Sequence, residues 1–131
     1  DGANITYGGA GIFSYGTVTI DNCICNNHKS GIIAYGTATI SNCVCNNNNY
    51  GITNYGEAVI CNCTCNSNVE RGITNRGTAN ISNCTCNSSY SGIFNDSSSV
   101  KSIIIGNRCL NNDINIGDMG TGSVLANNIT A

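Results

Sequence analysis

The residues of this 131-residue chain with the greatest capacity for chemistry are its ten cysteines. Thiolates bind soft metal ions and form disulfides, whereas a protonated, buried thiol behaves as a small apolar group. Eight of the cysteines form Cys-x-Cys pairs, which are Cys23/Cys25, Cys43/Cys45, Cys63/Cys65 and Cys84/Cys86. Cys61 and Cys109 stand outside these pairs. The pairs recur at a nearly constant interval, so the elements that position them must recur at the same interval.

The whole chain follows this interval. Gly-Ile begins a new copy of the repeat at positions 11, 31, 51, 72 and 92, with one extra residue near residues 68–71. In the second copy, residues 37–40 (T-A-T-I) alternate small or polar with apolar side chains, which is typical of a strand. Residues 43–45 (C-V-C) and 51–52 (G-I) predict two more short strands. Asn42 and Gly36 suit the corners between strands, because Asn and Gly tolerate positive φ.

Three short strands and three corners in each copy of the repeat predict one coil of a parallel β-helix. The predicted fold class is therefore all-β, a β-solenoid in which each strand pairs with its equivalent one coil away, at ~4.8 Å. We expect a single domain over residues 1–131, with regular coils over 11–91 and irregular coils over 92–131. Stacking predicts one apolar column of Ile20, Ile40, Ile60 and Ile81, and another of Ile12, Ile32, Ile52, Ile73 and Ile93. It also predicts a polar column of Asn26, Asn46, Asn66 and Asn87.

Both cysteines of each pair are expected to point inward, because the corner at Asn42 breaks the simple alternation. Three interpretations of the pairs are open: an interior ladder of thiols, disulfides between neighbouring coils, and a metal site. One strand spacing lies within the ~4.4–6.8 Å between Cα atoms that a disulfide accepts. No histidine accompanies the pairs, and flat stacked coils do not present a tetrahedron of ligands. The prediction is therefore a structural cysteine ladder with no metal and no cofactor.

The acidic residues give no pattern typical of a catalytic site. A calcium cluster on one face would require acids that recur at the period of the repeat, and the seven acids of this chain do not. A glycosidase-like pair such as Asp113 with Asp118 is not favoured over solvated loop acids. His28, the only histidine, is expected to be exposed in a polar turn. The sequence therefore predicts no catalytic residues and no enzymatic activity.

A column of aromatic residues is the main candidate for ligand binding. Tyr15, Tyr35 and Tyr55 are expected to stack, and Arg76 and Asp96 continue the same column. Arg76 can lie over the ring of Tyr55 and pair with Asp96. The strip formed by Tyr15, Tyr35, Tyr55 and Arg76 either stabilises the rod or binds sugar rings.

An outward face of threonines is the second candidate surface. Thr17 and Thr19 are expected to stack beneath Thr37 and Thr39, and regular rows of Thr on a flat solenoid resemble ice-binding surfaces. The rows break at the residues that follow them in the stack, which are Glu57, Val59 and Asn80.

Composition limits the possible partners. Only 9% of the residues are charged and the formal net charge is −2. Nucleic acids and anionic membrane surfaces attract basic patches, so neither is an expected partner. No apolar run approaches the length of a membrane-spanning helix, and we expect no membrane insertion.

The repeat resembles that of a known group of proteins. Residues 36–43 (G-T-A-T-I-S-N-C), followed by N-N and G-I, resemble the β-helix repeats of bacterial surface proteins. These include the polymorphic outer-membrane adhesins, to whose G-G-A-I and F-x-x-N motifs residues 8–12 (G-G-A-G-I) and 92–95 (G-I-F-N) are similar, and the wider pectin-lyase-like superfamily. The tail, residues 105–129, resembles β-helix segments of phage tail spikes. The resemblance covers most of the chain and implies a right-handed parallel β-helix that is secreted and lies outside the cell or at its surface.

Two functions are consistent with these observations. The first is a non-catalytic, extracellular structural or adhesive module that associates with itself end to end into a filament or stalk, because open solenoid ends template further strand pairing. Side-by-side association competes with end-to-end stacking. The second is a tail-spike-like β-helix that binds or depolymerises carbohydrate, suggested by the tyrosine column and the irregular tail. The expected partners are further copies of the chain and, second, surface glycans.

Overall fold

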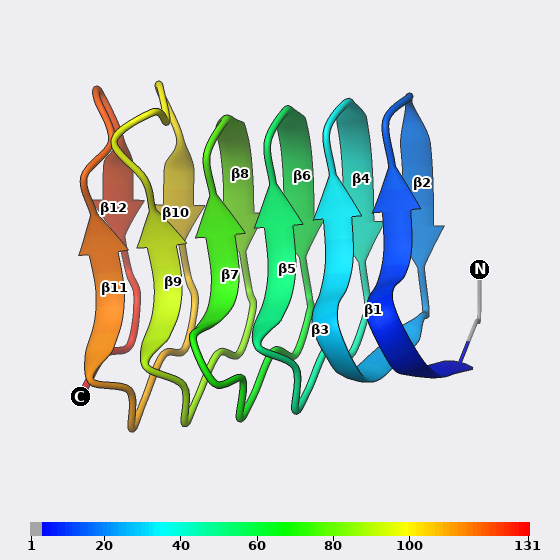
Figure 1. Cartoon of the computed structure of the whole chain (residues 1–131). Coiled ribbons are helices and arrows are strands. Elements are labelled where there is room, and N and C mark those ends of the chain that lie inside the picture. The colour runs from blue at the N-terminus through cyan, green and yellow to red at the C-terminus, as the bar shows by residue number, and fades with distance from the viewer. Residues whose placement is uncertain (1–3) are drawn as a thin grey trace.

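The chain is a stack of coils, each of which contributes one strand to each of two parallel sheets (Figure 1). The computed structural model describes residues 4–131, with side chains from residue 9 onward. Each strand pairs with the equivalent strand of the next coil, in parallel register throughout. Six strands in each sheet correspond to about six coils. The predicted all-β, parallel β-solenoid is confirmed.

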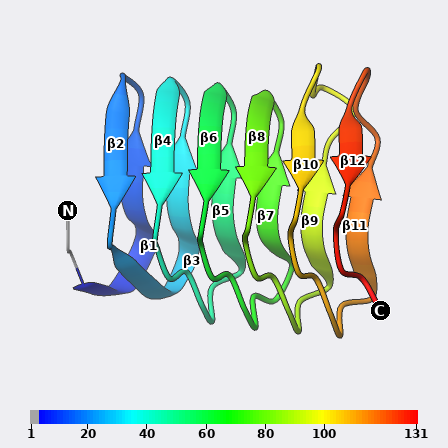
Figure 2. The same cartoon turned by 180° about the vertical axis from the view of Figure 1, so that it is seen from behind.

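Two six-stranded sheets form the long sides of the rod. One faces the reader in Figure 1, and the other faces the reader in Figure 2, where the molecule is turned by 180°. Sheet A contains β1 (Asn4–Ser14), β3 (Ile24–Ala34), β5 (Tyr50–Asn54), β7 (Arg71–Asn75), β9 (Ser91–Asn95) and β11 (Ile114–Asp118). Sheet B contains β2 (Val18–Asp21), β4 (Thr37–Ser41), β6 (Glu57–Cys61), β8 (Thr78–Ser82), β10 (Ile103–Ile105) and β12 (Val124–Ala126). The described residues contain no helix that could cross a membrane.

The third side of the coil is narrower than the sequence predicts. In place of a short strand over residues 43–45, only Val44 forms a bridge, to Ile24 and Thr64 of the neighbouring coils. The bridge continues through Thr85 and Arg108 to Ile129. Asn42 and Asn47, with positive φ of 53° and 58°, bound this short extended segment. In the preceding coil the equivalent residues 24–26 do form a strand, because they begin β3 and pair with residues 4–6 of β1. The predicted third strand is therefore present at residues 24–26 and reduced to single-residue bridges in the later coils.

Asparagine forms the corner that follows sheet B, as predicted. The corner residues with φ of 53–54° are Asn22, Asn42, Asn62, Asn83 and Asn127. Gly36 occupies a different corner for a different reason. The positive-φ glycines among the described residues are Gly106 and Gly122, and Gly36 does not join them. A Cβ at Gly36 would collide with the carbonyl oxygens of Tyr15 and Gly16 in the coil before, so close approach of two backbones excludes a side chain there.

The core consists of the two predicted isoleucine columns and the cysteines. Ile32, Ile52, Ile73 and Ile93 of sheet A are fully buried, and Ile12 is half-buried against them. In sheet B, Ile20, Ile40, Ile60 and Ile81 are buried, and Ile104 continues their column. The eight paired cysteines all point inward with at most 2% exposure. Cys109 is also buried, and Cys61 lies half-buried on the outside of sheet B.

Polar columns run parallel to the apolar ones. In the predicted Asn26–Asn46–Asn66–Asn87 column, each side-chain oxygen accepts a hydrogen bond from the backbone N–H of the next asparagine, at 2.7–2.9 Å. A second column, which the sequence analysis did not identify, is fully buried. In it the Nδ2 atoms of Asn54 and Asn75 each donate to the Oδ1 of the next asparagine, Asn75 and Asn95, at 2.8 Å. Asp118 ends this column by accepting a bond of 2.7 Å from Asn95.

The extra residue predicted near residues 68–71 is accommodated by a bulge. The backbone N–H groups of Glu70 and Arg71 both donate to the carbonyl of Asn49, at 2.9 and 3.3 Å, so two residues oppose one. A longer insertion follows β9, where Ile103 of β10 still pairs with Asn80 of β8. Insertions are therefore confined to corners, and the strands keep their register.

Replacing Ile40 by alanine tests the core. Because Ile40 is completely buried, Ile40→Ala is expected to lower the free energy of unfolding by ~2–5 kcal/mol through a cavity. Thr39→Ala, in the same strand but exposed, is the control and should cost less than ~0.5 kcal/mol. Urea unfolding measures both. Equal stability of the two variants would contradict the inward position of the Ile40 column.

Candidate functional site

The cysteines form two thiol columns inside the rod. One contains Cys23, Cys43, Cys63 and Cys84, and the other contains Cys25, Cys45, Cys65, Cys86 and Cys109. In the first column the Sγ of Cys43 donates to the Ser41 carbonyl at 3.2 Å. In-register parallel strands place equivalent Cβ atoms about one strand spacing apart, ~4.8 Å, which exceeds the ~3.5–4.5 Å of disulfides. The geometry therefore favours packed thiols over disulfides between coils.

The surroundings of several of these thiols suppress their reactivity. Hydrogen bonding to Cys45 and burial raise the pKa of Cys25 far above that of a free thiol. For Cys63, a hydrogen bond with Cys43 lowers the pKa, but the bond with Cys84 and burial outweigh it and raise the pKa to about 12. A thiol that stays protonated at neutral pH is a poor nucleophile and a poor metal ligand. The ladder therefore acts as packing.

Three acidic side chains, those of Asp21, Asp96 and Asp118, make structural contacts. Among the described residues no group of three or more His, Cys, Asp or Glu side chains is placed to hold a metal ion. Hydrogen bonds from Asn42 and Ser41, both 2.9 Å, lower the pKa of Asp21 and tie β2 to the next coil. Asp96 pairs with Arg76, and Asp118 ends the buried Asn column.

His28 is buried, with 4% exposure, so the prediction of an exposed turn residue was wrong. It follows Asn27, whose φ of 64° turns the chain so that the next side chain points inward. His28 begins a column continued by Asn48 and Asn68, and its backbone N–H donates to Asn48 Oδ1 at 2.7 Å. The sequence contained an indication of this burial. His28 lies one repeat before Asn48 and two before Asn68, so the three residues had to share one column.

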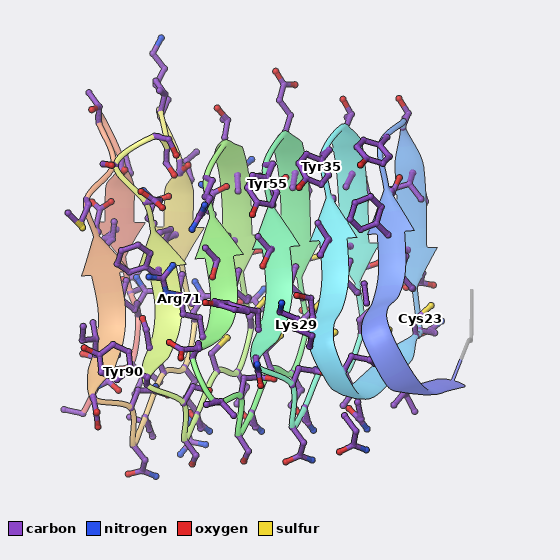
Figure 3. The ribbon with its side chains drawn as sticks, viewed as in Figure 1. Cys23, Lys29, Tyr35, Tyr55, Arg71 and Tyr90 are labelled. Carbon is purple, nitrogen blue, oxygen red and sulfur yellow. The ribbon has the colours of Figure 1, made fainter. Side chains whose placement is uncertain are left out.

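The predicted tyrosine strip is present as a column that crosses sheet A just beyond the C-terminal ends of its strands (Figure 3). The ring centroids of Tyr15 and Tyr35 are 5.0 Å apart, and those of Tyr35 and Tyr55 are 4.5 Å apart with nearly parallel planes. The guanidinium of Arg76 lies 5.5 Å from the Tyr55 centroid, and its Nε is 3.3 Å from Asp96. The structure thus brings all four predicted strip residues together.

The stacking leaves little ring face for a ligand. Tyr35 is covered on both faces by Tyr15 and Tyr55, and Arg76 covers the far face of Tyr55. Phe13 packs edge-on against Tyr15, with centroids 4.9 Å apart. A sugar ring that stacks on tyrosine needs an open face, whereas this column offers mainly ring edges and hydroxyls. Stabilisation of the rod is the contribution that these contacts make directly.

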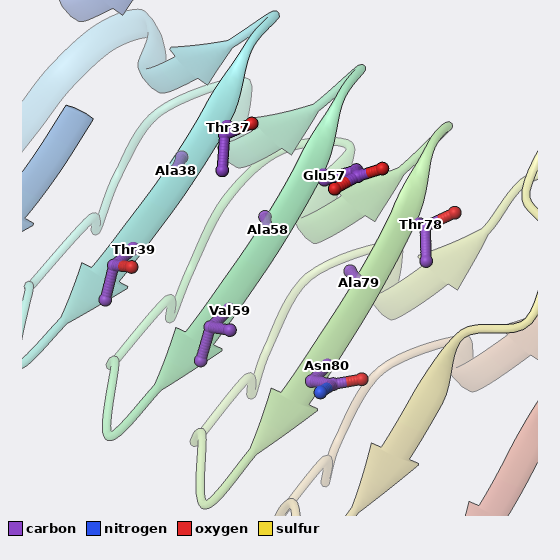
Figure 4. Close-up of a pocket in the computed structure, with 9 residues that line it drawn as sticks. All are labelled: Thr37, Ala38, Thr39, Glu57, Ala58, Val59, Thr78, Ala79 and Asn80. Carbon is purple, nitrogen blue, oxygen red and sulfur yellow. The ribbon is translucent and has the colours of Figure 1, made fainter. Parts of the chain in front are cut away.

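Two shallow depressions occur on the outer faces of the sheets. One, of about 250 Å³, lies on sheet B between two rows of outward side chains (Figure 4). One row is Thr37, Glu57 and Thr78, and the other is Thr39, Val59 and Asn80. The predicted threonine face is therefore outward, and its rows are interrupted in the way the sequence indicates.

The other depression, of about 190 Å³, lies on sheet A beside the tyrosine column. Its lining residues are Lys29, Ser30, Ile33, Tyr50, Thr53, Tyr55, Thr74 and Arg76. The sequence analysis found only its edge, at Tyr55 and Arg76. The remaining residues were missed because their outward positions become visible only once the register of sheet A is known.

Comparison of the chain with protein-family models, curated proteins and solved structures gave no match. The fold therefore defines the class of protein, a parallel β-solenoid, and its function must be inferred from the geometry.

Because of the thiol ladder, the free energy of unfolding is expected to depend on pH in the alkaline range. The thiols with raised pKa include Cys25, Cys43, Cys45, Cys63, Cys65 and Cys86. They stay protonated in the folded state but ionise above pH ~9 when unfolded, so rising pH favours unfolding. We expect the free energy of unfolding to fall by up to ~1.4 kcal/mol per pH unit for each such thiol. Urea titrations from pH ~7 to ~10 measure this slope.

Cys63→Ala should flatten the slope by one thiol. Ser82→Ala, which removes no thiol, is the control and should leave the slope unchanged. A pH-independent stability in this range, together with masses showing bonded pairs, would contradict a ladder of thiols.

The buried Asn column predicts a second stability effect. Asn75→Ala removes one acceptor of Asn54 Nδ2 and the donor to Asn95 Oδ1, so each of these buried amides loses a hydrogen bond, although Asn54 Nδ2 keeps its bond to the Gly56 carbonyl. Each lost bond to a buried amide costs ~1–3 kcal/mol, so a decrease of several kcal/mol in the free energy of unfolding is expected. Asn80→Ala, at an exposed position on sheet B, is the control. A near-neutral Asn75→Ala would show that water replaces the lost partners.

Proposed function

We propose that this chain is a non-catalytic structural and adhesive rod that acts outside the cell and stacks end to end with further copies into a filament or stalk. The observation that supports stacking is the character of the last coil. Leu125 pairs in register with Ile104, which is fully buried, yet Leu125 itself is 42% exposed. Leu125 thus occupies a core position whose outer side is not covered by any of the described residues.

The surroundings of Leu125 extend this apolar end. Ile116, at the sheet A core position of the same coil, pairs with the fully buried Ile93 and is itself only half-buried. Among the described strands, β11 and β12 each pair with a neighbour on one side only, β9 and β10, so their other backbone edge is open. Apolar core residues beside an open strand edge favour the addition of another parallel coil.

The first coils present a matching cross-section. Ile12 is the half-buried member of the sheet A column, and Ile20 begins the sheet B column in the strand that follows. In the last coil the corresponding positions are Ile116 and Leu125, with nearly the same separation along the chain. A second copy translated along the axis would set Ile12 over Ile116 and Ile20 over Leu125. In this register residues 129–131 of the first copy would take the place of residues 4–6 of the second, which pair with residues 24–26 in the isolated rod. A contact of this kind joins different surfaces, does not close, and grows into a filament.

The proposal of a non-catalytic role is supported by thiols that stay protonated and by the structural contacts of Asp21, Asp96 and Asp118. The extracellular location and the adhesive role rest on the resemblance of residues 36–43 to repeats of bacterial surface adhesins and the pectin-lyase-like superfamily. A tail-spike-like carbohydrate-binding β-helix is the second candidate, and the depression on sheet A favours it.

A charge at the open end is expected to prevent stacking. Leu125→Asp places a carboxylate at a position that stacking would bury, which is strongly unfavourable without a partner. Val59→Asp, equally exposed but in the middle of sheet B, is the matched control. Light scattering and electron microscopy over a concentration series should show rods lengthening for the parent chain and the control, and single rods for Leu125→Asp.

A parent chain that stays monomeric on concentration would overturn the stacking proposal. Lateral clusters that survive Leu125→Asp would instead assign assembly to the sides of the rod.

A further inference from the structure

The depression on the outer face of sheet A arises from one row of the strand register. Phe13, Ile33, Thr53, Thr74 and Phe94 occupy equivalent outward positions in successive strands. Two short threonines thus lie between the larger Ile33 and Phe94, and the surface is hollow above them. The row that contains Ser30 and Tyr50 forms one wall of the hollow, and the tyrosine column forms the other.

Positive charge gathers around this hollow. The chain has five lysines and arginines. Lys29 and Arg76 line the hollow, and Arg71 lies on the same face next to the lining residue Tyr50. Figure 3 labels Lys29 and Arg71, which lie below Tyr55 in that view. The ion pair found among the described residues is Arg76–Asp96 at 3.3 Å, which leaves Lys29 and Arg71 without an acidic partner. Such a concentration is notable on a chain of net charge −2.

Arg71 is held in place to act as a donor. Its guanidinium carbon lies 3.9 Å from the centroid of Phe94, so the plane of the group rests on the ring. Stacking on Phe94 fixes the plane of the guanidinium group, and its N–H edge stays free for a bidentate hydrogen bond to a carboxylate. Little side-chain entropy remains to be lost when a ligand binds.

The floor of the hollow contains an unsatisfied hydroxyl. Thr74 is 1% exposed, and its Oγ1 is buried with no hydrogen-bond partner. Leaving a hydroxyl in this state costs free energy that a bound polar group would recover. Threonine exchanges its hydroxyl and methyl by rotation about χ1, so a ligand above Thr74 can draw the hydroxyl toward it.

We propose that this hollow binds one acidic sugar residue of a surface glycan, with its carboxylate on Arg71 and Lys29. The hydroxyls of Ser30, Tyr50, Thr53 and Thr74 supply the mixed donors and acceptors that sugar hydroxyls need. The volume of about 190 Å³ is below the ~300–1,000 Å³ of sites for drug-sized ligands, which fits a single residue of a chain. A densely charged polyanion is disfavoured because the rest of the chain is acidic, with a pI near 4.9.

This inference deepens the adhesive part of the proposed function and is independent of end-to-end stacking. Binding is therefore measured on the Leu125→Asp rod, which also removes the avidity that a filament would add. The probes are immobilised glycans in matched pairs, sialylated against desialylated and glucuronate-containing against glucose-containing, with a phosphorylated glycan as a third arm.

The variants separate charge from fold. Arg71→Met keeps an apolar stem over Phe94 but removes the donors, and Lys29→Met removes the second charge at an exposed position. Arg108→Met, at an exposed cation on the third side of the rod, is the matched control. We expect the carboxylated member of a pair to bind about tenfold more tightly than its neutral partner, Arg71→Met and Lys29→Met each to abolish most of this preference, and Arg108→Met to retain it.

Thr74→Val, which keeps the shape of the side chain but removes the hydroxyl, should weaken binding while leaving the thermal unfolding temperature unchanged or raised. Equal binding of neutral and acidic glycans, binding of the phosphorylated glycan alone, or an equal loss in Arg108→Met would each overturn the proposal. Failure of the parent chain to stack would leave this result unaffected.

Discussion

The in-register stacking of equivalent residues is the constraint on which the rest of this structure depends. Each coil satisfies its backbone hydrogen bonds through the coils on either side, so a residue is tolerated only if it packs on its own counterpart. Isoleucine meets this requirement through apolar contact, and asparagine meets it through side-chain bonds to the next coil. Tyrosine meets it through ring stacking. The near-identity of the repeats follows from this requirement.

Cysteine meets the same stacking requirement in the narrow part of the coil's cross-section. Beyond Asn42 the chain must turn, extend for a short distance and turn again, while two side chains point into limited space. A thiol is small enough for that space and apolar enough to be buried. The consequence is a redox-capable residue type in an environment that keeps it protonated. A high cysteine content therefore reflects shape here and is poor evidence of chemistry.

The sequence predicted the architecture well because a regular repeat reveals the register directly. Knowing that Ile40 stacks on Ile60 requires only counting, and both are fully buried. Counting could not show that Gly36 is needed for close backbone approach, or that Asn27 turns His28 inward, because both depend on backbone angles within a corner. The hollow on sheet A was missed for a related reason. It depends on two threonines being shorter than their neighbours across strands, a comparison made between columns and not along the chain.

The bulge at Glu70 and Arg71 affects which strands pair with each other when the chain folds. Interchangeable repeats invite the error of skipping a coil, since a strand that pairs with the wrong copy loses almost nothing in side-chain matching. The coil lengthened by the bulge and the longer coil after β9 break this equivalence, because a shifted pairing would place the bulge opposite a regular corner. The two irregular coils therefore favour one strand register over the others and fix the order of coils that would otherwise be equivalent.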